Sequence, residues 1–302
     1  MKKLNLLIVL FTGIIIYSCS SDDNPTDNPD SEKALTQIIY QNDQYQFTQK
    51  IEYDDSGNVI EINDNNGLVY SSNTYNSSNQ LTKHEFNEYE NGTLYFKEID
   101  NLTYNSDNKI SNIEHISFSY NSDGSISNQT SVNNIITYSN NSMIRTVDDF
   151  WNTRIEFGLT NDLITSIKVY RSNELKSDMA FSYDSNRNCI SGTGSIDEGS
   201  LDSTTDNIDL TVTYGVQEKN PFFNMFFNYE ILTFTSFYNL RQVLINQQGN
   251  NYPEIIQWYQ YSDYTYKETN GNSFDSNGYI TSRILSEFPD YPNYGTINYT
   301  WE

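Results

Sequence analysis

The sequence predicts an all-β protein built as one long antiparallel β-meander of repeated hairpins. The chain contains 25 Tyr and 16 Phe residues and is rich in Asn, Ser and Thr, a composition that favours strands joined by turns. Apolar and polar residues alternate with period two in many segments, which indicates strands with one buried face. A short motif also recurs along most of the chain, as expected for a repeat architecture.

Residues 1–18 are predicted to form a lipoprotein signal peptide. Lys2 and Lys3 supply the positive start, and residues 6–16 form an apolar stretch. This stretch is too short to span a bilayer, for which about 20 residues are needed. The signal peptide ends just before Cys19, and a small residue, Ser18, precedes that cysteine. This arrangement resembles the lipobox of bacterial lipoproteins. We therefore expect the segment to be removed and the protein to contact the membrane through a lipid on Cys19.

Residues 19–33 are predicted to form a disordered, acidic tether. The segment 20–31 is rich in Ser, Asp, Asn and Pro, which cannot bury enough apolar area to order the chain. Asp22 and Asp23, just after the cysteine, resemble the surface-export signals of Bacteroidota-type lipoproteins. This resemblance implies a lipid-anchored protein of the outer membrane that faces the cell exterior, with a periplasmic orientation as the alternative.

Residues 34–302 are predicted to form a single repetitive β domain. The repeat reads: an aromatic residue, Asp or Asn, two polar residues, usually Gly or Asn, any residue, and an apolar residue. The Asp or Asn can hydrogen-bond the backbone two residues on, and the Gly or Asn tolerates the left-handed conformation that closes the loop. Each copy should therefore reverse the chain. The clear copies begin at Tyr53, Tyr75, Tyr104, Tyr120, Tyr183 and Phe274.

The repeat resembles the tyrosine-aspartate (YD/RHS-like) repeats of large bacterial shell proteins and of many uncharacterised Bacteroidota-type lipoproteins. The lipoproteins match better, because they combine a lipobox, a polar tether, such hairpins and an Asn-Pro-Phe segment, here Asn220-Pro221-Phe222. Some domains of this group are described as having a porin-like fold. The resemblance implies a curved sheet or a closed, barrel-like structure, and it offers no activity or site residues to transfer.

One region interrupts the strand pattern. Residues 196–209 form an acidic, Ser/Thr-rich loop, and a strand then leads into four phenylalanines at helical spacing. We expect one short helix near 221–228 that packs against the sheet. An aromatic ligand groove is the alternative.

Few residues point to catalysis, a metal or a cofactor. His84 and His115 have no motif around them and are expected to be strand residues, so neither a metal site nor a Cys–His pair is predicted. Cys189 falls at the apolar position of its repeat and is expected to be a buried hydrophobe. The segment 184–188 matches the start of a calcium loop, but the Gly and Glu that should follow are absent, so it is interpreted as a turn.

Charge and motifs together favour a non-catalytic binding protein. The net charge of −23 argues against nucleic acid as a partner, since binding phosphates needs clustered Lys and Arg. Carboxylate pairs such as Asp148 with Asp149, or Glu85 with Glu88, have no motif that marks them as catalytic. We predict an outer-membrane or cell-surface lipoprotein that binds a glycan, peptide or protein. The alternatives are an accessory subunit of an outer-membrane complex, an enzyme such as a glycoside hydrolase, and a membrane-inserted barrel.

The candidate ligand-binding residues are aromatic. Tyr and Trp offer flat faces to sugar rings or peptides at low entropic cost. Core packing is the alternative role. The densest cluster consists of Trp258, Tyr259, Tyr261, Tyr264 and Tyr266.

Overall fold

The structure, a computed structural model, confirms the predicted all-β class. The described residues form strands and turns without a helix, and none of them belongs to a helix that could cross a membrane. The signal peptide, the tether and the helix expected near 221–228 lie outside the described residues and stay predictions. The described residues are 34–41, 46–161, 163–196, 206–219, 251–259, 265–269, 271–277, 279–285 and 295–302.

Nineteen strands follow one another along the described chain. They are β1 (Leu35–Gln41), β2 (Gln46–Tyr53), β3 (Val59–Asp64), β4 (Val69–Tyr75), β5 (Leu81–Glu90), β6 (Thr93–Tyr104), β7 (Ile110–Tyr120), β8 (Ile126–Ser139), β9 (Ser142–Val147), β10 (Arg154–Thr160), β11 (Leu163–Arg171), β12 (Glu174–Tyr183), β13 (Cys189–Ile196), β14 (Asp206–Lys219), β15 (Asn251–Tyr259), β16 (Thr265–Thr269), β17 (Gly271–Phe274), β18 (Ile280–Leu285) and β19 (Gly295–Trp301).

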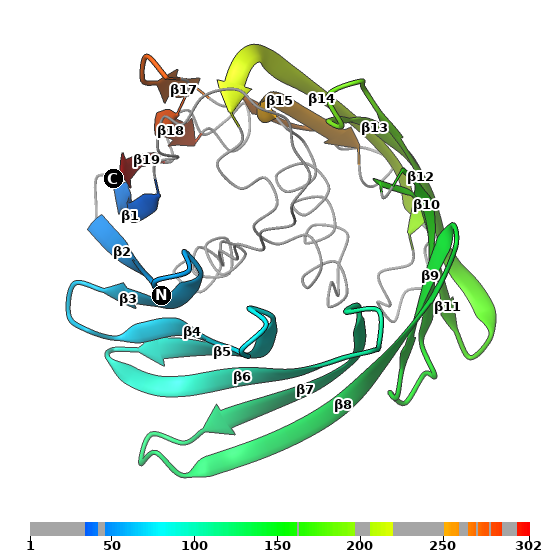
Figure 1. The fold of residues 1–302 in the computed structure, drawn as a ribbon, viewed down its shortest axis with the longest axis horizontal. Coiled ribbons are helices and arrows are strands. Elements are labelled where there is room, and N and C mark those ends of the chain that lie inside the picture. Colours follow the sequence, from blue (N-terminus) through cyan, green and yellow to red (C-terminus); the bar gives the residue numbers. More distant parts are fainter. Residues whose placement is uncertain are drawn as a thin grey trace.

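The strands form one antiparallel meander that curls into a ring (Figure 1). Consecutive strands pair with one another from β1 to β16 and from β17 to β19, and β1 also pairs with β19. Ala34 and Glu302 exchange two backbone hydrogen bonds of 2.7 and 2.9 Å beside this closing pair. In the described part, β16 pairs with β15 and β17 pairs with β18, and β16 and β17 follow each other along the chain with one residue between them. The sheet is strongly curved, one of the two predicted forms.

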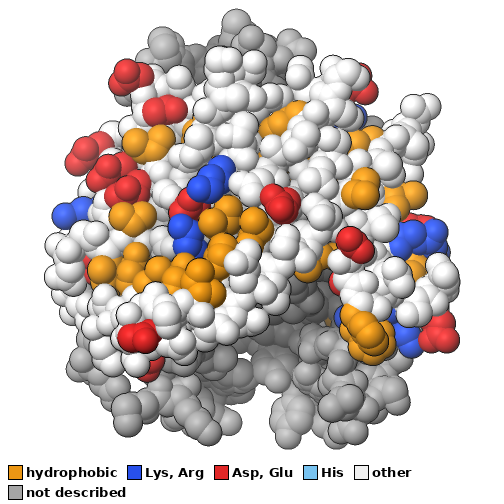
Figure 2. Space-filling view, turned by 90° about the horizontal axis from the view of Figure 1, so that it is seen from below, with side chains coloured by type: hydrophobic (Ala, Val, Ile, Leu, Met, Phe, Trp, Pro, Cys, Tyr) orange, Lys and Arg blue, Asp and Glu red, His pale blue; other side chains and the backbone are white. Residues whose placement is uncertain are grey.

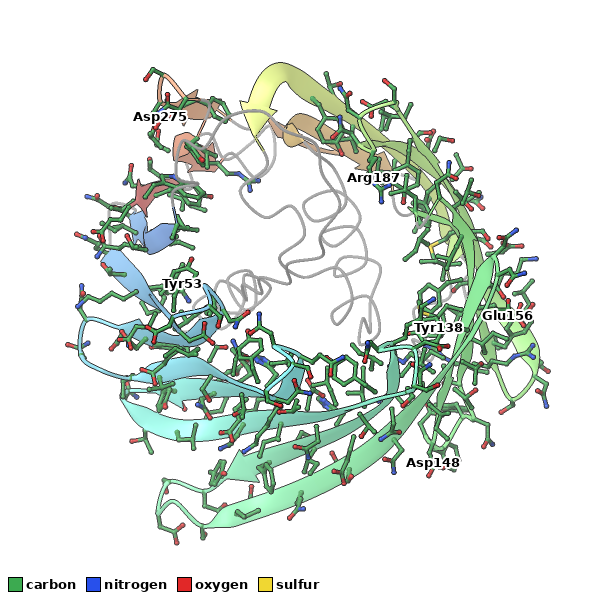
Figure 3. The ribbon with its side chains drawn as sticks, in the orientation of Figure 1. Tyr53, Tyr138, Asp148, Glu156, Arg187 and Asp275 are labelled. Carbon is green, nitrogen blue, oxygen red and sulfur yellow. The ribbon has the colours of Figure 1, made fainter. Side chains whose placement is uncertain are left out.

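The hydrophobic core lies on the concave side of the sheet. Tyr138 lies on this side and Glu156 on the convex side (Figure 3). Directly paired residues share a face, and the register runs from Tyr138 to Met143, then to Phe157 and Ile167. Met143, Phe157 and Ile167 are 6 %, 0 % and 0 % exposed. The surface seen from below Figure 1 is mixed, with hydrophobic side chains among charged and other polar ones (Figure 2).

The repeat forms hairpin loops by the predicted mechanism. In the first copy, Asp54 Oδ1 accepts hydrogen bonds from the backbone N–H groups of Ser56 and Asn58 at 2.8 and 2.9 Å. Gly57 has a φ of +80°, so the loop closes through a left-handed residue. The same two bonds form at Asn76, Asn105, Asp184 and Asp275. The predicted mechanism is therefore confirmed in five of the six copies. In the copy that begins at Tyr120, Asp123 Oδ1 and not Asn121 accepts from the backbone N–H of Ser125.

Aromatic residues in alternate strands, most of them at or near the strand end, tie neighbouring hairpins together. Their polar hydrogen is donated to the carbonyl of a residue near the start of an earlier strand, and each bond stabilises the fold by about 1 kcal/mol. The bonds run from Tyr53 to Leu35 (2.7 Å), Tyr75 to Val59 (3.0 Å), Tyr104 to Leu81 (2.8 Å), Tyr138 to Ile110 (2.9 Å), Tyr183 to Ile164 (2.7 Å), Tyr214 to Cys189 (2.9 Å), and from the Trp301 indole to Ile280 (2.7 Å).

The two ends of the sheet differ. Consecutive strands are antiparallel, so the connections after β2, β4, β6, β8, β10 and β12 lie at the end where Ala34 and Glu302 meet. We name this the terminal end; it carries the aromatic ties. The connections after β3, β5, β7, β9 and β11 lie at the opposite, distal end. These include the loop 148–153 and the turn 172–173.

Candidate functional site

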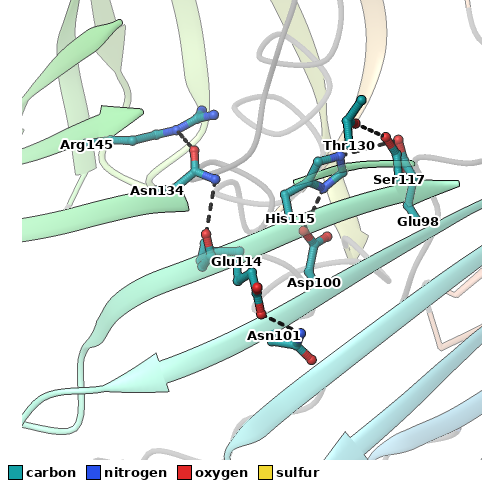
Figure 4. Close-up of polar contacts among 10 residues, drawn as sticks. Glu98, Asp100, Asn101, Glu114, His115, Ser117, Thr130, Asn134 and Arg145 are labelled. Atoms are coloured by element: carbon teal, nitrogen blue, oxygen red, sulfur yellow. Dashed lines mark hydrogen bonds and ion pairs between the residues drawn. The ribbon is translucent and has the colours of Figure 1, made fainter. Parts of the chain in front are cut away.

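Polar side chains interrupt the apolar concave face across β6, β7 and β8 (Figure 4). The register pairs Asp100 with His115, and it pairs Ser117 with Glu98 on one side and Thr130 on the other. The Ser117 and Thr130 hydroxyls lie 2.6 Å apart and are hydrogen-bonded. We name this group the concave cluster; it consists of Glu98, Asp100, His115, Ser117 and Thr130.

His115 is held between two carboxylates. Its Nδ1 lies 2.8 Å from Asp100 Oδ1, and its Nε2 lies 3.7 Å from Glu98 Oε1. The Asp100 side chain is 8 % exposed, whereas those of His115 and Glu98 are 32 % and 35 % exposed. The hydrogen bond to Asp100 raises the pKa of His115, although burial opposes this shift. Asp100 therefore fixes the ring and favours its protonated form, while about a third of the His115 side chain remains exposed.

The pKa of Glu98 is also raised. Burial is the largest cause, and the nearby charges of Asp100 and Glu88 add to it, while His115 acts in the opposite direction. Glu98 is thus a carboxyl group that gains a proton more readily than a free glutamate. The concave cluster can consequently accept and donate hydrogen bonds at adjacent positions.

Arg145 places a buried positive charge beside the concave cluster. Its Nε donates to Asn134 Oδ1 at 2.8 Å, and Asn134 Nδ2 donates to the Ile113 carbonyl at 3.2 Å. Burial lowers the pKa of Arg145 to about 10, and the charge of Asp100 opposes this effect. Arg145 therefore stays a cation at neutral pH. The charges of Asp100 and Asp149 favour this buried cation, which would be costly without nearby negative charge.

His84 lies on the other side of Asp100 in the register. It is 4 % exposed, and its Nδ1 lies 2.8 Å from Asn73 Oδ1. The Asn73 amide nitrogen donates to the Val59 carbonyl at 2.9 Å, so its oxygen accepts the hydrogen of His84 Nδ1. Burial lowers the pKa of His84 to about 4, against the opposing charges of Asp100 and Glu85. Asp100 therefore lies between one neutral and one readily charged imidazole.

The predicted aromatic candidates lie elsewhere, on β15 and β16. The register pairs Trp258 with Tyr266, and on the other side it pairs Trp258 with the fully buried Leu210. Tyr259 lies opposite Asp209. Tyr261 and Tyr264 are outside the described residues, and the binding role of the five aromatic residues stays a prediction.

The remaining candidates have structural roles. Cys189 is 0 % exposed, and burial raises its pKa to about 12, which agrees with its interpretation as a buried hydrophobe. Asp184 accepts hydrogen bonds from the backbone of Asn186 and Asn188, so the calcium-like segment forms a turn as predicted. His84 and His115 are strand residues, as expected. Within the described ranges, no three His, Cys, Asp or Glu side chains gather in a way that would hold a metal ion.

The carboxylate pairs considered from sequence are engaged by other groups. Glu85 forms ion pairs with Lys83 and Lys97. Glu88 accepts a hydrogen bond from the hydroxyl of Tyr95. Neither arrangement resembles an acid and a base facing across a substrate, for which a defined carboxylate separation is needed.

The concave cluster was not predicted from the sequence, although the sequence contains a pattern that indicates it. Asp100 precedes the buried Leu102 by two residues, and His115 follows the buried Ile113 by two. Period-two alternation therefore places both on the buried face. Charged residues are almost never fully buried unless paired, so two titratable residues at core positions of adjacent strands predict a partnership.

Comparisons with known proteins find similarity to solved structures at low sequence identity. No model of a known protein family matches it, and no curated protein does. A porin-like protein from Bacteroides vulgatus ATCC 8482 is similar over 90 % of this chain and 99 % of that chain, with 9 % identity and a TM-score of 0.48. A porin-like protein from Bacteroides uniformis ATCC 8492 is similar over 73 % and 97 %, with 16 % identity and a TM-score of 0.36.

A third solved structure, TcdB2-TccC3-TEV, is similar over 87 % of this chain but only 16 % of that chain, with 11 % identity and a TM-score of 0.24. All three likenesses thus have TM-scores below 0.5.

Proposed function

We propose that the protein is a non-catalytic binding protein, anchored to the outer membrane by a lipid on Cys19 and facing the cell exterior, which holds a glycan or peptide at the concave cluster. The observation that carries the binding role is the half-exposed His115, fixed by Asp100 and flanked by Glu98. Charged and polar groups on an otherwise apolar face are costly unless they are paired or used. Here the side chains of His115 and Glu98 stay 32 % and 35 % exposed.

The chemistry of the concave cluster suits a ligand rich in hydroxyl or amide groups. The imidazole donates, the carboxylates accept, and the Ser117–Thr130 hydroxyl pair can do either. Such a mixed set matches the mixed donors and acceptors of a sugar ring or a peptide backbone. The thiol of Cys189 is buried and its pKa is raised, so it is not available as a nucleophile.

Removing two members of the concave cluster should weaken ligand binding. His115→Ala and Thr130→Ala should each reduce affinity for the preferred ligand by about tenfold, the effect of losing about 1.4 kcal/mol of hydrogen bonding. The measurement is calorimetric titration of the full-length protein in mild detergent against a panel of oligosaccharides and peptides.

Gln129→Ala is the matched control, because Gln129 neighbours Thr130 in β8 but pairs with Phe118 and so belongs to the opposite face. The Gln129→Ala variant should bind the preferred ligand with the same affinity as the wild type. If no member of the panel binds, or if all three variants bind alike, the concave cluster is not the ligand site. An accessory role in an outer-membrane complex would then be the better explanation.

The anchor has its own test. Cys19→Ala removes the atom that carries the lipid, so the variant should be released from the membrane fraction into the soluble fraction of the cell envelope. Intact cells expressing the wild type should lose the protein to added protease if it faces the exterior. A Cys19→Ala variant that remains in the membrane fraction would contradict the proposed anchor.

A further inference from the structure

Two aromatic side chains protrude from the distal end of the sheet. Phe150 and Trp151, in the loop 148–153, are 87 % and 55 % exposed. Leu175, which follows the turn 172–173, is 51 % exposed. The two connections touch, because the Ser172 N–H donates to the Trp151 carbonyl at 2.7 Å. Large apolar side chains gathered on a surface often mark an interaction site.

The backbone of this aromatic loop is fixed. Asp149 Oδ1 accepts from the N–H groups of Trp151 and Thr153 at 3.1 and 2.8 Å, and Asp149 Oδ2 accepts from the Thr153 hydroxyl at 2.6 Å. Asn152 has a φ of +48°, and the Phe150 and Trp151 rings meet edge to face with centroids 5.0 Å apart. The loop therefore presents its aromatic rings in one arrangement before any partner arrives, which reduces the entropic cost of binding.

We propose that this aromatic loop is a binding platform for a neutral glycan chain. The ring face of Trp151 can cover the apolar face of a sugar, while the exposed polar residues Asp148, Asn152 and Asn173 supply hydrogen-bonding groups for its hydroxyls. Aromatic area beside carboxylate and amide groups suits a sugar better than it suits a purely apolar partner. The site is separate from the concave cluster and does not depend on it.

Local charge selects a neutral rather than an acidic glycan. The basic residues nearby are paired: Arg154 lies 3.2 Å from Glu156 and over the ring of Tyr170, and Lys176 lies 3.0 Å from Glu174. The whole chain carries a net charge of −23, which repels polyanions. An acidic polysaccharide or an anionic lipid would therefore find little to attract it here.

The position of the loop agrees with a partner outside the membrane. The chain enters the sheet at Ala34, at the terminal end, whereas the aromatic loop lies at the distal end. If the proposed anchor at Cys19 is present, the loop points away from the membrane that holds it.

The test is affinity electrophoresis of the full-length protein in mild detergent through gels containing an α-glucan, a β-glucan, an α-mannan or the acidic polysaccharide alginate. At least one neutral polysaccharide should retard the protein, and alginate should not. Trp151→Ala should weaken that retardation at least tenfold, and Phe150→Ala should weaken it less. Ile126→Ala, which removes another exposed apolar side chain of the sheet, should change nothing.

Four results would overturn the proposal: no retardation by any neutral polysaccharide, retardation that survives Trp151→Ala, equal loss in Ile126→Ala, or binding to alginate. A lipid partner is tested separately, with the anchored protein in nanodiscs of brominated phosphatidylcholine. Quenching of fluorescence that disappears in Trp151→Ala would show that the loop enters lipid, and this too would overturn the proposal. Because retardation in the gel needs neither the anchor nor His115, its failure is distinguishable from failure of the proposed function.

Discussion

Replacing Gly194 by alanine should destabilise the protein by more than about 4 kcal/mol, at the extreme of what single substitutions do. A Cβ at Gly194 would lie 2.1 Å from the carbonyl oxygen of Asp178 and 2.7 Å from the Cα of Met179. Both atoms belong to the backbone of β12, which pairs with β13 through the register Met179–Gly194. No side-chain rearrangement can relieve this collision, so the two strands must separate. The measurement is urea unfolding of the full-length protein followed by circular dichroism.

Gly57→Ala is the matched control for this prediction. Gly57 has a φ of +80°, but nothing lies within 4 Å of the position that its Cβ would take. Its replacement should therefore cost only the strain of a left-handed alanine, about 1 kcal/mol. Equal stability of the two variants would contradict the close approach of β12 and β13.

The hairpin loops were the part of the fold most open to prediction, because their geometry is determined locally. An acceptor side chain and a left-handed position three residues later are sufficient, and even Arg187 adopts a φ of +67° there. Two further loops use the same Asp device at Asp64 and Asp149. The sequence rule missed them because no aromatic residue precedes either aspartate. The repeat pattern therefore combined two features, the turn and the aromatic residue that hydrogen-bonds an earlier strand. The turn also forms where that aromatic residue is absent.

The concave cluster depended on information that the repeat does not contain. Antiparallel order makes β6 and β7 neighbours, but which residue faces His115 depends on the register shift between Thr103 and Tyr104. A slip of one residue would move every side chain of the strand to the other face. Alternation is sufficient to place Asp100 and His115 on buried faces, but only the register of β6 and β7 brings His115 Nδ1 to 2.8 Å from Asp100 Oδ1.

Lowering the pH from 7 to 4.5 should destabilise the wild type by about 2–3 kcal/mol relative to His84→Gln. The pKa of His84 is lowered from 6.5 to about 4 by burial, and each tenfold loss of proton affinity on folding corresponds to about 1.4 kcal/mol. Because the folded pKa is the lower one, the unfolded chain takes up the proton first as the pH falls. Stability is therefore lost progressively below about pH 6.5 and levels off near pH 4. Urea unfolding of both proteins at several pH values measures the difference.

His115→Gln should change the pH profile in the opposite direction. The pKa of His115 is raised by its hydrogen bond to Asp100, so its contribution to stability is complete below the unfolded pKa and is lost as the pH rises through the folded pKa. Without His115 the protein should lose more stability than the wild type on acidification, whereas without His84 it should lose less. Acidic residues outside the concave cluster titrate alike in all three proteins, so they cancel from the comparison. Two variants that shift in the same direction would contradict the opposite effects of the protein on the pKa values of His84 and His115.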